Sequence, residues 1–311
     1  MTSKVWTLAE VSDSELARLR LDCRPTGLPS GIGIERRVPG GIPCDKVTTL
    51  FAESGSFKTT VLGNMLLAMA RAGHRVLSVT LEDSKELAAH RFLAGQSGLA
   101  YGEISGGTLD AADVGRLAVS DDARAVASRI WVVDDIEPRI EVILELALKA
   151  KQSSAGLGCL AIDYLQLLEG PGLEKDVLAR AVKSCARFAG QHKVAVVLVS
   201  QQRQESERDR ADPRPLIGDM FGSSAMRMGS KLVLALFRPW NYCRVPGKSP
   251  KWATEYGHFI AANPDHLALY PRFLEVHCLK NVLGDTRPVL LLVNPATGTV
   301  EPGDAIMAPY L

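Results

Sequence analysis

The sequence lacks paired cysteines, an excess of charge of one sign, and any long apolar run. Its six cysteines are scattered without a C-x-x-C pair, which argues against a structural zinc site or a disulfide framework and favours a reducing cytoplasm. Lys and Arg total 36 against 35 Asp and Glu, so the chain lacks the basic excess of proteins that coat nucleic acid. Any contact with nucleic acid must therefore be local.

Two further classes of protein are excluded by the N-terminus and the short apolar runs. The first residues, MTSKVWTLAEVSDSEL, carry acids where a signal peptide has its apolar core, and VAVVLV (194–199) is far shorter than a membrane span. No Gly/Ser-rich or Pro-rich linker divides the 311 residues. We therefore expect one large domain in a soluble, intracellular protein without a membrane partner.

What the sequence has is an alternation of apolar strands and amphipathic helices. The predicted strands are 46–51, 75–82, 129–135, 159–168 and 194–200, and the predicted helices are 58–73, 85–95 (capped by Ser84), 139–152 and 174–192. This order predicts an α/β fold with a mostly parallel sheet covered by helices on both faces. Three later strands, 231–237, 272–280 and 288–293, lack long helices between them, so we expect them to extend the sheet as antiparallel strands. The stretch 241–250 is predicted to be a surface loop.

The stretch FAESGSFKTT (51–60) has the outline of a phosphate-binding loop. It lies between a strand and a helix N-terminus, where N–H groups and the helix dipole favour an anion. Lys58 and Thr59 fill the last positions of G-x-x-x-x-G-K-[ST], but Ala52 and Phe57 stand where the glycines belong. Ala52 adds only a methyl, whereas we expect Phe57 to need a negative φ and a ring turned away from the phosphates. Neither change removes an N–H donor.

Polar residues lie at or near the ends of three predicted strands. Asp163 follows three apolar residues in LAIDYLQL, and an acid there can hold Mg²⁺ through water beside Thr59. Glu82 ends a strand in VTLEDS, so in a parallel sheet it opens on the edge where the loop lies and could orient water for attack on a γ phosphate. Ser200 and Gln201 end a third strand and are suited to sensing a phosphate.

A dinucleotide fold is a second interpretation of the same loop. Glu82 or Asp83, at the end of the next strand, would then hold a ribose hydroxyl. That fingerprint requires three glycines, of which only Gly55 is in place. The phosphate-loop interpretation is therefore favoured.

Taken in order, these segments resemble the RecA-fold ATPase domain of DnaB-type replicative helicases, including the helicase half of phage primase-helicases. The matching segments are Thr26-Gly27, Gly40-Gly41, the phosphate loop, TLE ending at Glu82, DYLQL at 163–167, Ser200-Gln201, DMFGSS at 219–224 and LKNVLGDT at 279–286. The resemblance covers about residues 26–301. It implies a RecA-like P-loop domain over 36–311, preceded by an N-terminal segment over 1–35.

The resemblance also implies ATP and Mg²⁺ as cofactors and assigns roles by position. Lys58 would contact the phosphates, Thr59 and Asp163 would hold Mg²⁺, Glu82 would be the catalytic base and Gln201 the sensor. The residues that would surround the nucleotide are Ala52, Glu53, Ser54, Gly55, Ser56, Phe57, Lys58, Thr59 and Thr60.

The chain departs from the family pattern at two arginines. Phe221 replaces the Arg of D-L-R, and Val282 replaces the Arg finger of K-x-R-x-G, although Lys280 retains the Lys. Arg287 is the nearest guanidinium and could serve as a finger in a neighbour's site. The alternative is that Arg287 merely begins a strand in solvent.

In the family, the segment from Gln202 to Met228 lines the channel of the ring, so contact with single-stranded DNA is expected there. Its candidate DNA-binding residues are Arg203, Arg208, Arg210, Arg214 and Arg227. Four acids lie among them, so a solvated, charge-balanced loop remains the alternative.

A short helix is expected at 12–21, with Ser12 or Ser14 as its cap. It resembles the linker helix by which family members clasp the next subunit. The alternative is a helix packed on its own domain.

The sequence therefore predicts an ATP-hydrolysing DNA helicase or translocase that forms a ring, expected to be a hexamer, in a bacterial or phage-infected cytoplasm. A primase or a helicase loader would be a further partner. Two alternatives remain: a RecA-fold DNA-dependent ATPase acting as recombination mediator or helicase loader, and a non-catalytic ring or adaptor protein whose site has decayed.

Overall fold

The computed structural model describes residues 7–21, 27–117, 119–203, 212–243, 270–282 and 284–303. Thr26, Arg208, Arg210 and most of the predicted loop 241–250 lie outside these ranges. Within them, no helix is both long enough and apolar enough to span a bilayer.

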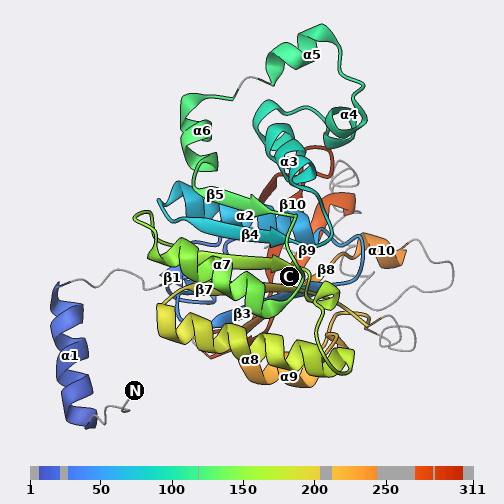
Figure 1. Ribbon diagram of the computed structural model, residues 1–311. Helices are drawn as coiled ribbons and strands as arrows, with labels where there is room; N and C mark the ends of the chain where they lie inside the picture. The colour runs from blue at the N-terminus through green and yellow to red at the C-terminus, as the bar shows by residue number, and fades with distance from the viewer. Residues whose placement is uncertain are drawn as a thin grey trace.

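A nine-stranded sheet forms the centre of the described structure (Figure 1). In spatial order its strands are β11 (Val300–Pro302), β10 (Val289–Val293), β9 (Phe273–Asn281), β8 (Ser230–Phe237), β3 (Val47–Ala52), β7 (Ala195–Gln201), β6 (Cys159–Asp163), β4 (Val76–Thr80) and β5 (Ile130–Val133). The strands from β8 to β5 are parallel, and β9, β10 and β11 continue the sheet as antiparallel strands. A separate antiparallel pair joins β1 (Gly27–Leu28) to β2 (Ile42–Pro43). The predicted RecA-like α/β class is confirmed.

The orientation expected for the first of the later strands is wrong. β9 and β10 are antiparallel as predicted, but β8 runs parallel to β3. A parallel neighbour requires a crossover, which the short helix α9 (Ser223–Gly229) supplies between β7 and β8. The seven residues SSAMRMG are too few to give a helical pattern that could be recognised in the sequence.

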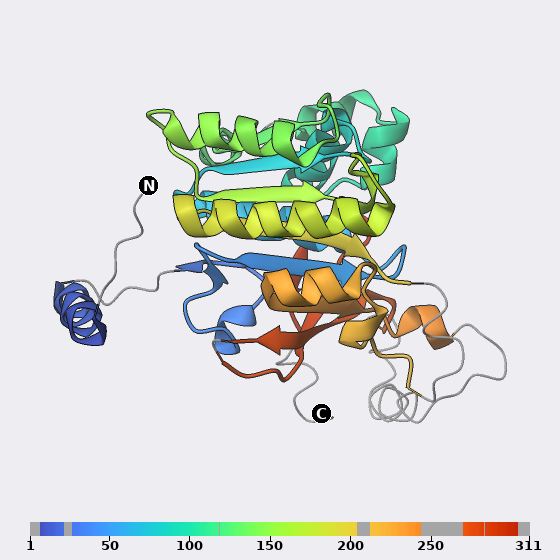
Figure 2. The ribbon, with the colours of Figure 1, turned by 60° about the horizontal axis from the view of Figure 1, so that its bottom comes forward.

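Helices cover both faces of the sheet, as the continuous apolar strands predict. The helices in chain order are α1 (Leu8–Leu21), α2 (Lys58–Arg71), α3 (Lys85–Ser97), α4 (Tyr101–Gly106), α5 (Ala111–Arg116), α6 (Asp121–Ala127), α7 (Ile140–Gln152), α8 (Glu174–His192), α9 and α10 (Trp240–Cys243). In β3, Leu50 packs with α2 on one face, and Phe51 packs with α7 and α8 on the other. Figure 2 shows α7 and α8 side by side across that second face. Ser84 caps α3 as predicted, since its Oγ accepts a hydrogen bond from Leu87 N.

Helix α1 is confirmed but begins before the predicted start. Its N-terminus is closed by Thr7 and Glu10, because Thr7 donates from its N–H and hydroxyl to the Glu10 carboxylate and accepts from Glu10 N. The caps expected at Ser12 and Ser14 are therefore wrong. The helix lies away from the sheet (Figures 1 and 2), and Leu8 and Leu16 are 82% and 51% exposed.

Candidate nucleotide site

The predicted phosphate loop lies at the carboxyl edge of the parallel strands. β3 ends at Ala52 and α2 begins at Lys58, so residues 53–57 connect a buried strand to a helix N-terminus. The register pairs Ala52 with Gln201 of β7, and Thr80 of β4 with Asp163 of β6. The strand-end residues chosen from the sequence are thus brought to one edge of the sheet, where α/β folds bind ligands.

Lys58 is folded onto its own loop. Its ammonium donates hydrogen bonds to the carbonyl oxygens of Ala52 at 3.1 Å and Glu53 at 3.0 Å. Burial lowers the pKa of Lys58, against the opposing effect of the negative charges of Asp163 and Glu82. A partly desolvated cation held by two neutral carbonyls can exchange them for phosphate oxygens.

Thr59 and Asp163 form the second contact across the edge. The Thr59 hydroxyl donates to Asp163 Oδ2 at 2.9 Å, and Asp163 is only 6% exposed. Burial raises the pKa of Asp163 to about 6, although the hydrogen bond from Thr59 acts in the opposite direction. A hydroxyl and a carboxylate are the hard oxygen donors that Mg²⁺ takes alongside phosphate and water, so these two residues fit the metal. In the described ranges no three His, Cys, Asp or Glu gather into a complete protein-only metal site.

Glu82 and Gln201 lie at the same edge of the sheet. Glu82 follows β4, is exposed, and lies near enough for its charge to raise the pKa of Asp163. Gln201 is the half-buried last residue of β7, beside Ser200, whose Oγ accepts a hydrogen bond from Gln166 at 2.9 Å. The exposure of Glu82 suits a base that faces water. The position of Gln201 at a strand end suits a phosphate sensor.

Phe57 does not have the backbone conformation that we expected. Its φ is 61° and its ψ is 24°, in the left-handed region, so the prediction of a negative φ is wrong. A residue in the left-handed region lets successive backbone N–H groups point toward the same anion. Glycine adopts that conformation without strain. For a residue with a Cβ, the left-handed conformation costs about 1–2 kcal/mol of conformational free energy. The Phe57 ring packs against the core cluster around α2 and lies 4.3 Å from the Arg238 guanidinium.

Sequence reasoning missed two residues that touch the loop. Arg238 Nη1 donates to Gly55 O at 3.4 Å, and Asn241 Nδ2 donates to Ser56 Oγ at 3.3 Å. Both follow β8, whose expected antiparallel orientation would have placed its end at the far edge. The available signal was a polar residue directly after the apolar run 231–237, the same signal that identified Asp163 and Gln201.

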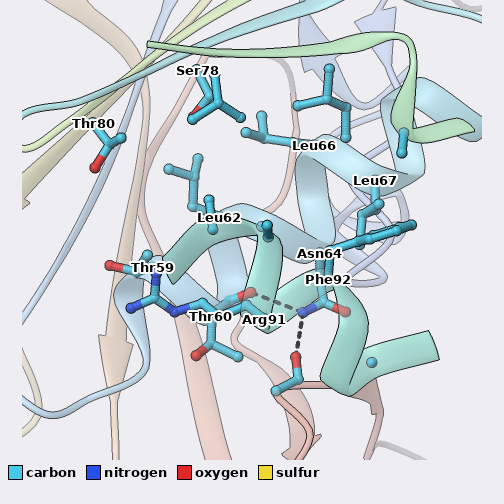
Figure 3. Close-up of a pocket in the computed structure, with 18 of the residues that line it drawn as sticks. Thr59, Thr60, Leu62, Asn64, Leu66, Leu67, Ser78, Thr80, Arg91 and Phe92 are labelled. Atoms are coloured by element: carbon cyan, nitrogen blue, oxygen red, sulfur yellow. Dashed lines mark hydrogen bonds between the residues drawn. The ribbon is translucent and has the colours of Figure 1, made fainter. Parts of the chain in front are cut away.

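A cavity of about 330 Å³ lies between α2 and α3, over β4 and β5 (Figure 3). Thr59, Thr60 and Asp163 line one end, and Leu62, Leu66, Leu67 and Phe92 are among its apolar walls. Asn64 closes it toward the C-terminal strands by donating to Thr60 O and Gly298 O, as the dashed lines in Figure 3 show. Thr59 and Asp163 therefore border open space on the α3 side.

The candidate DNA-binding arginines are in unlike surroundings. Arg203 is exposed just beyond β7, and Arg227 is exposed on α9. Arg214 instead makes two hydrogen bonds to the buried Glu275, at 2.8 and 3.0 Å. Burial acts to raise the pKa of Glu275, but hydrogen bonds from His277 and Arg214 outweigh it and hold that pKa at about 2. Arg214 therefore contributes to a buried ion pair of this chain.

The candidate Arg finger lies far from the loop of its own chain. Arg287 directly precedes β10, which is separated from β3 by β8 and β9, a displacement of about 14 Å at the usual strand spacing. The side chain is 74% exposed and pairs with Asp285 at 2.5 Å. Lys280 is engaged elsewhere, donating to Arg227 O and Ser230 O. A finger role for Arg287 would have to be played at the site of another subunit.

Comparison with known proteins agrees with this geometry. Residues 27–269 match the family described as DnaB-like helicase C terminal domain. The chain is 27% identical over 218 residues to the replicative DNA helicase DnaB of Geobacillus stearothermophilus, covering 68% of this chain and 47% of that protein. It is 28% identical over 221 residues to the replicative DNA helicase DnaC of Bacillus subtilis (strain 168), covering 68% and 47%. The chain thus spans about half the length of these relatives.

Solved structures share the fold. The ATPase domain of G40P superposes with a TM-score of 0.79 at 20% identity, covering 96% of this chain and 99% of that one. A DnaB-like replicative helicase, described together with its interactions with primase, gives 0.76 at 18% identity, covering 96% and 67%. With most of its length matched by the family, and with the phosphate loop, Asp163 and Gln201 meeting at one sheet edge, this chain belongs to the DnaB-like helicase C-terminal domain family.

Proposed function

We propose that this chain is an ATP-dependent DNA helicase of a replication system, forming a ring and moving along single-stranded DNA as ATP is hydrolysed at its subunit interfaces. The observation that carries the proposal is the meeting of Lys58, Thr59, Asp163 and Glu82 at one sheet edge. The relatives named as replicative DNA helicases support the same activity.

Each residue has a task that its surroundings allow. Lys58 would exchange its two loop carbonyls for phosphate oxygens, and Thr59 and Asp163 would hold Mg²⁺, which would supply positive charge to neutralise the phosphates. Glu82 faces solvent and accepts the proton of the attacking water. All of these groups lie at the carboxyl edge, so the γ phosphate would be placed between Lys58 and Glu82.

A chain of backbone contacts links the sensor to the predicted DNA segment. Phe221 N donates to Gln201 O at 3.1 Å, and Arg203 N donates to Asp219 O at 2.8 Å. Loss of the γ phosphate at Gln201 would therefore shift residues 219–221 and the arginines around them. Arg203 and Arg227 are the described candidates for contact with DNA phosphates, and Arg208 and Arg210 complete the set.

Two exposed features fit assembly into a ring. The apolar side chains of α1 are exposed and would be buried by docking on the next subunit. Arg287 is exposed and distant from its own loop, as an arginine finger acting on a neighbour requires. A hexamer with a primase or loader partner is the assembly we propose.

Hydrolysis and unwinding assays test this function. ATP turnover should rise with single-stranded DNA, and a forked duplex should be unwound, with Lys58→Ala as the inactive control. DNA-stimulated turnover without unwinding would favour a recombination mediator or helicase loader. Absence of turnover would favour a non-catalytic adaptor. Light scattering with and without ATP and Mg²⁺ measures the molar mass of the assembly and so tests the ring.

A further inference from the structure

The phosphate loop is held from outside by the residues that follow β8. The Arg238 guanidinium stacks on the Phe57 ring at 4.3 Å and donates to Gly55 O at 3.4 Å. The same guanidinium donates to Pro271 O at 3.1 Å, which fixes it to the segment before β9. Asn241, three residues later, donates to Ser56 Oγ and, at 3.5 Å, to Glu53 Oε2. These contacts engage carbonyls and side chains of the loop rather than its N–H groups.

Phe57 is the residue that most needs such support. It is one of two described non-glycine residues with positive φ, and it stands directly before Lys58. Without a restraint, a phenylalanine shifts toward negative φ, which would rotate the N–H groups on either side of it. A cation over an aromatic face is attractive, and the attraction grows when both partners are partly desolvated. The stacking on Arg238 thus favours the one conformation in which the ring meets the guanidinium.

We propose that Arg238 is a positioning residue for the nucleotide, acting through Phe57. Stacked on the ring, it holds Phe57 in the left-handed conformation that a glycine would adopt unaided, and so keeps the loop shaped for ATP. The proposal rests on the function proposed above, in which this loop binds ATP. It explains how a bulky residue can occupy the glycine position of the loop.

A loop shaped by Arg238 has a specific kinetic signature. Removing the guanidinium should weaken nucleotide binding about tenfold, because the cation–π contact that stabilises the loop conformation is lost. The reacting groups stay in place, so KM should rise while kcat changes less than about twofold. Replacing Phe57 by Gly should make the support unnecessary, because glycine adopts positive φ without strain.

A double-mutant cycle tests this directly. The dissociation constant of N-methylanthraniloyl-ATP, together with KM and kcat for ATP, is measured for the wild type, Arg238→Ala, Phe57→Gly and the double variant. We expect a rise of about tenfold in the dissociation constant and in KM for Arg238→Ala, and restoration to within about twofold of wild type in the double variant. Arg238→Gln also removes the charge but keeps more of the side-chain packing. It is used in place of Arg238→Ala if the alanine variant does not fold.

Arg272→Ala is the matched control. Arg272 also donates to a backbone carbonyl, that of Val293 at 3.2 Å, and its described contacts do not include the loop. It should leave nucleotide binding unchanged. If removing Arg238 costs as much affinity in the Phe57→Gly variant as in the wild type, the inference is overturned while the ATPase proposal stays intact. Failure of the wild type to bind the fluorescent nucleotide at all would overturn the proposed function and this inference with it.

Discussion

The Thr59 hydroxyl donates a 2.9 Å hydrogen bond to Asp163, 104 residues away in the sequence. The bond joins the N-terminus of α2 to the end of β6 and places both oxygen donors together. The carboxylate is buried at a free-energy cost, which the rise of its pKa to about 6 reflects. A buried carboxylate with a raised pKa is the arrangement that the proposed Mg²⁺ site calls for.

Asp163→Asn should stabilise the fold at neutral pH and abolish ATP hydrolysis. The pKa is raised from 3.8 to about 6, so the native state holds this proton more tightly than the unfolded state. The stabilisation from a protonated Asp163 is therefore complete below about pH 4 and is lost as pH rises through 6. At pH 7.5 the variant should be more stable by on the order of 3 kcal/mol, with little difference near pH 4.

Urea unfolding of the wild type and Asp163→Asn at several pH values measures this difference. The exposed Asp122→Asn on α6 is the control and should show no comparable pH dependence. A wild type that is the more stable protein at pH 7.5 would contradict the prediction.

Lys58→Ala should remove ATP hydrolysis, because Lys58 is the cation that the loop holds at two of its own carbonyls, whereas the Arg238 guanidinium stacks on Phe57 and contacts the loop from outside at Gly55 O. Steady-state turnover of the purified variant is the measurement, with circular dichroism as a check on folding. Turnover close to wild type in a folded variant would place the nucleotide elsewhere.

Glu82→Gln should bind ATP with wild-type affinity and lose turnover by at least about a hundredfold. The amide keeps the size of the side chain but cannot accept a proton from water. Nucleotide titration and single-turnover hydrolysis separate the two effects. A parallel fall in affinity and turnover would mean that Glu82 shapes the site instead of acting as its base.

Arg214→Ala should lower stability, whereas Arg227→Ala should lower the affinity for DNA. Arg214→Ala leaves Glu275 buried with one partner fewer, so the unfolding free energy should fall by about 3–5 kcal/mol. Arg227→Ala removes an exposed cation and should change stability by less than about 0.5 kcal/mol, while lowering affinity for single-stranded DNA and its salt dependence. Thermal unfolding and DNA titration at two salt concentrations compare them. A stable Arg214→Ala with weakened DNA binding would return Arg214 to the DNA-contacting set.

Arg287→Ala tests the finger across subunits. If Arg287 stabilises charge on a neighbour's γ phosphate, its loss should lower turnover by about a thousandfold or more. Mixing Lys58→Ala subunits with Arg287→Ala subunits should then restore part of the activity, because some interfaces combine an intact Lys58 with an intact Arg287. Full activity of Arg287→Ala alone, or no recovery in rings shown to be mixed, would exclude this role.

The sequence by itself determined the order of the main strands and of the long helices between them, and the sheet edge to which the candidate residues belong. Strands buried on both faces read as continuous apolar runs, and parallel strands end at the same edge. Glu82, Asp163 and Gln201 could therefore be placed together from their positions at or beside strand ends, with Lys58 at the start of the helix that follows β3. Each of these positions could be inferred because it depends only on the pattern of neighbouring residues within its own segment.

Only the tertiary structure decided how distant segments meet. The direction of β8, the left-handed Phe57 under Arg238 and the engagement of Arg214 by Glu275 each depend on partners far along the chain, 183 residues apart for Gly55 and Arg238 and 61 for Arg214 and Glu275. A local pattern records that a side chain is polar or apolar, but not which group will face it. Tertiary packing determines which groups face each other. A buried charge or a strained backbone conformation is tolerated only beside a partner that offsets its free-energy cost.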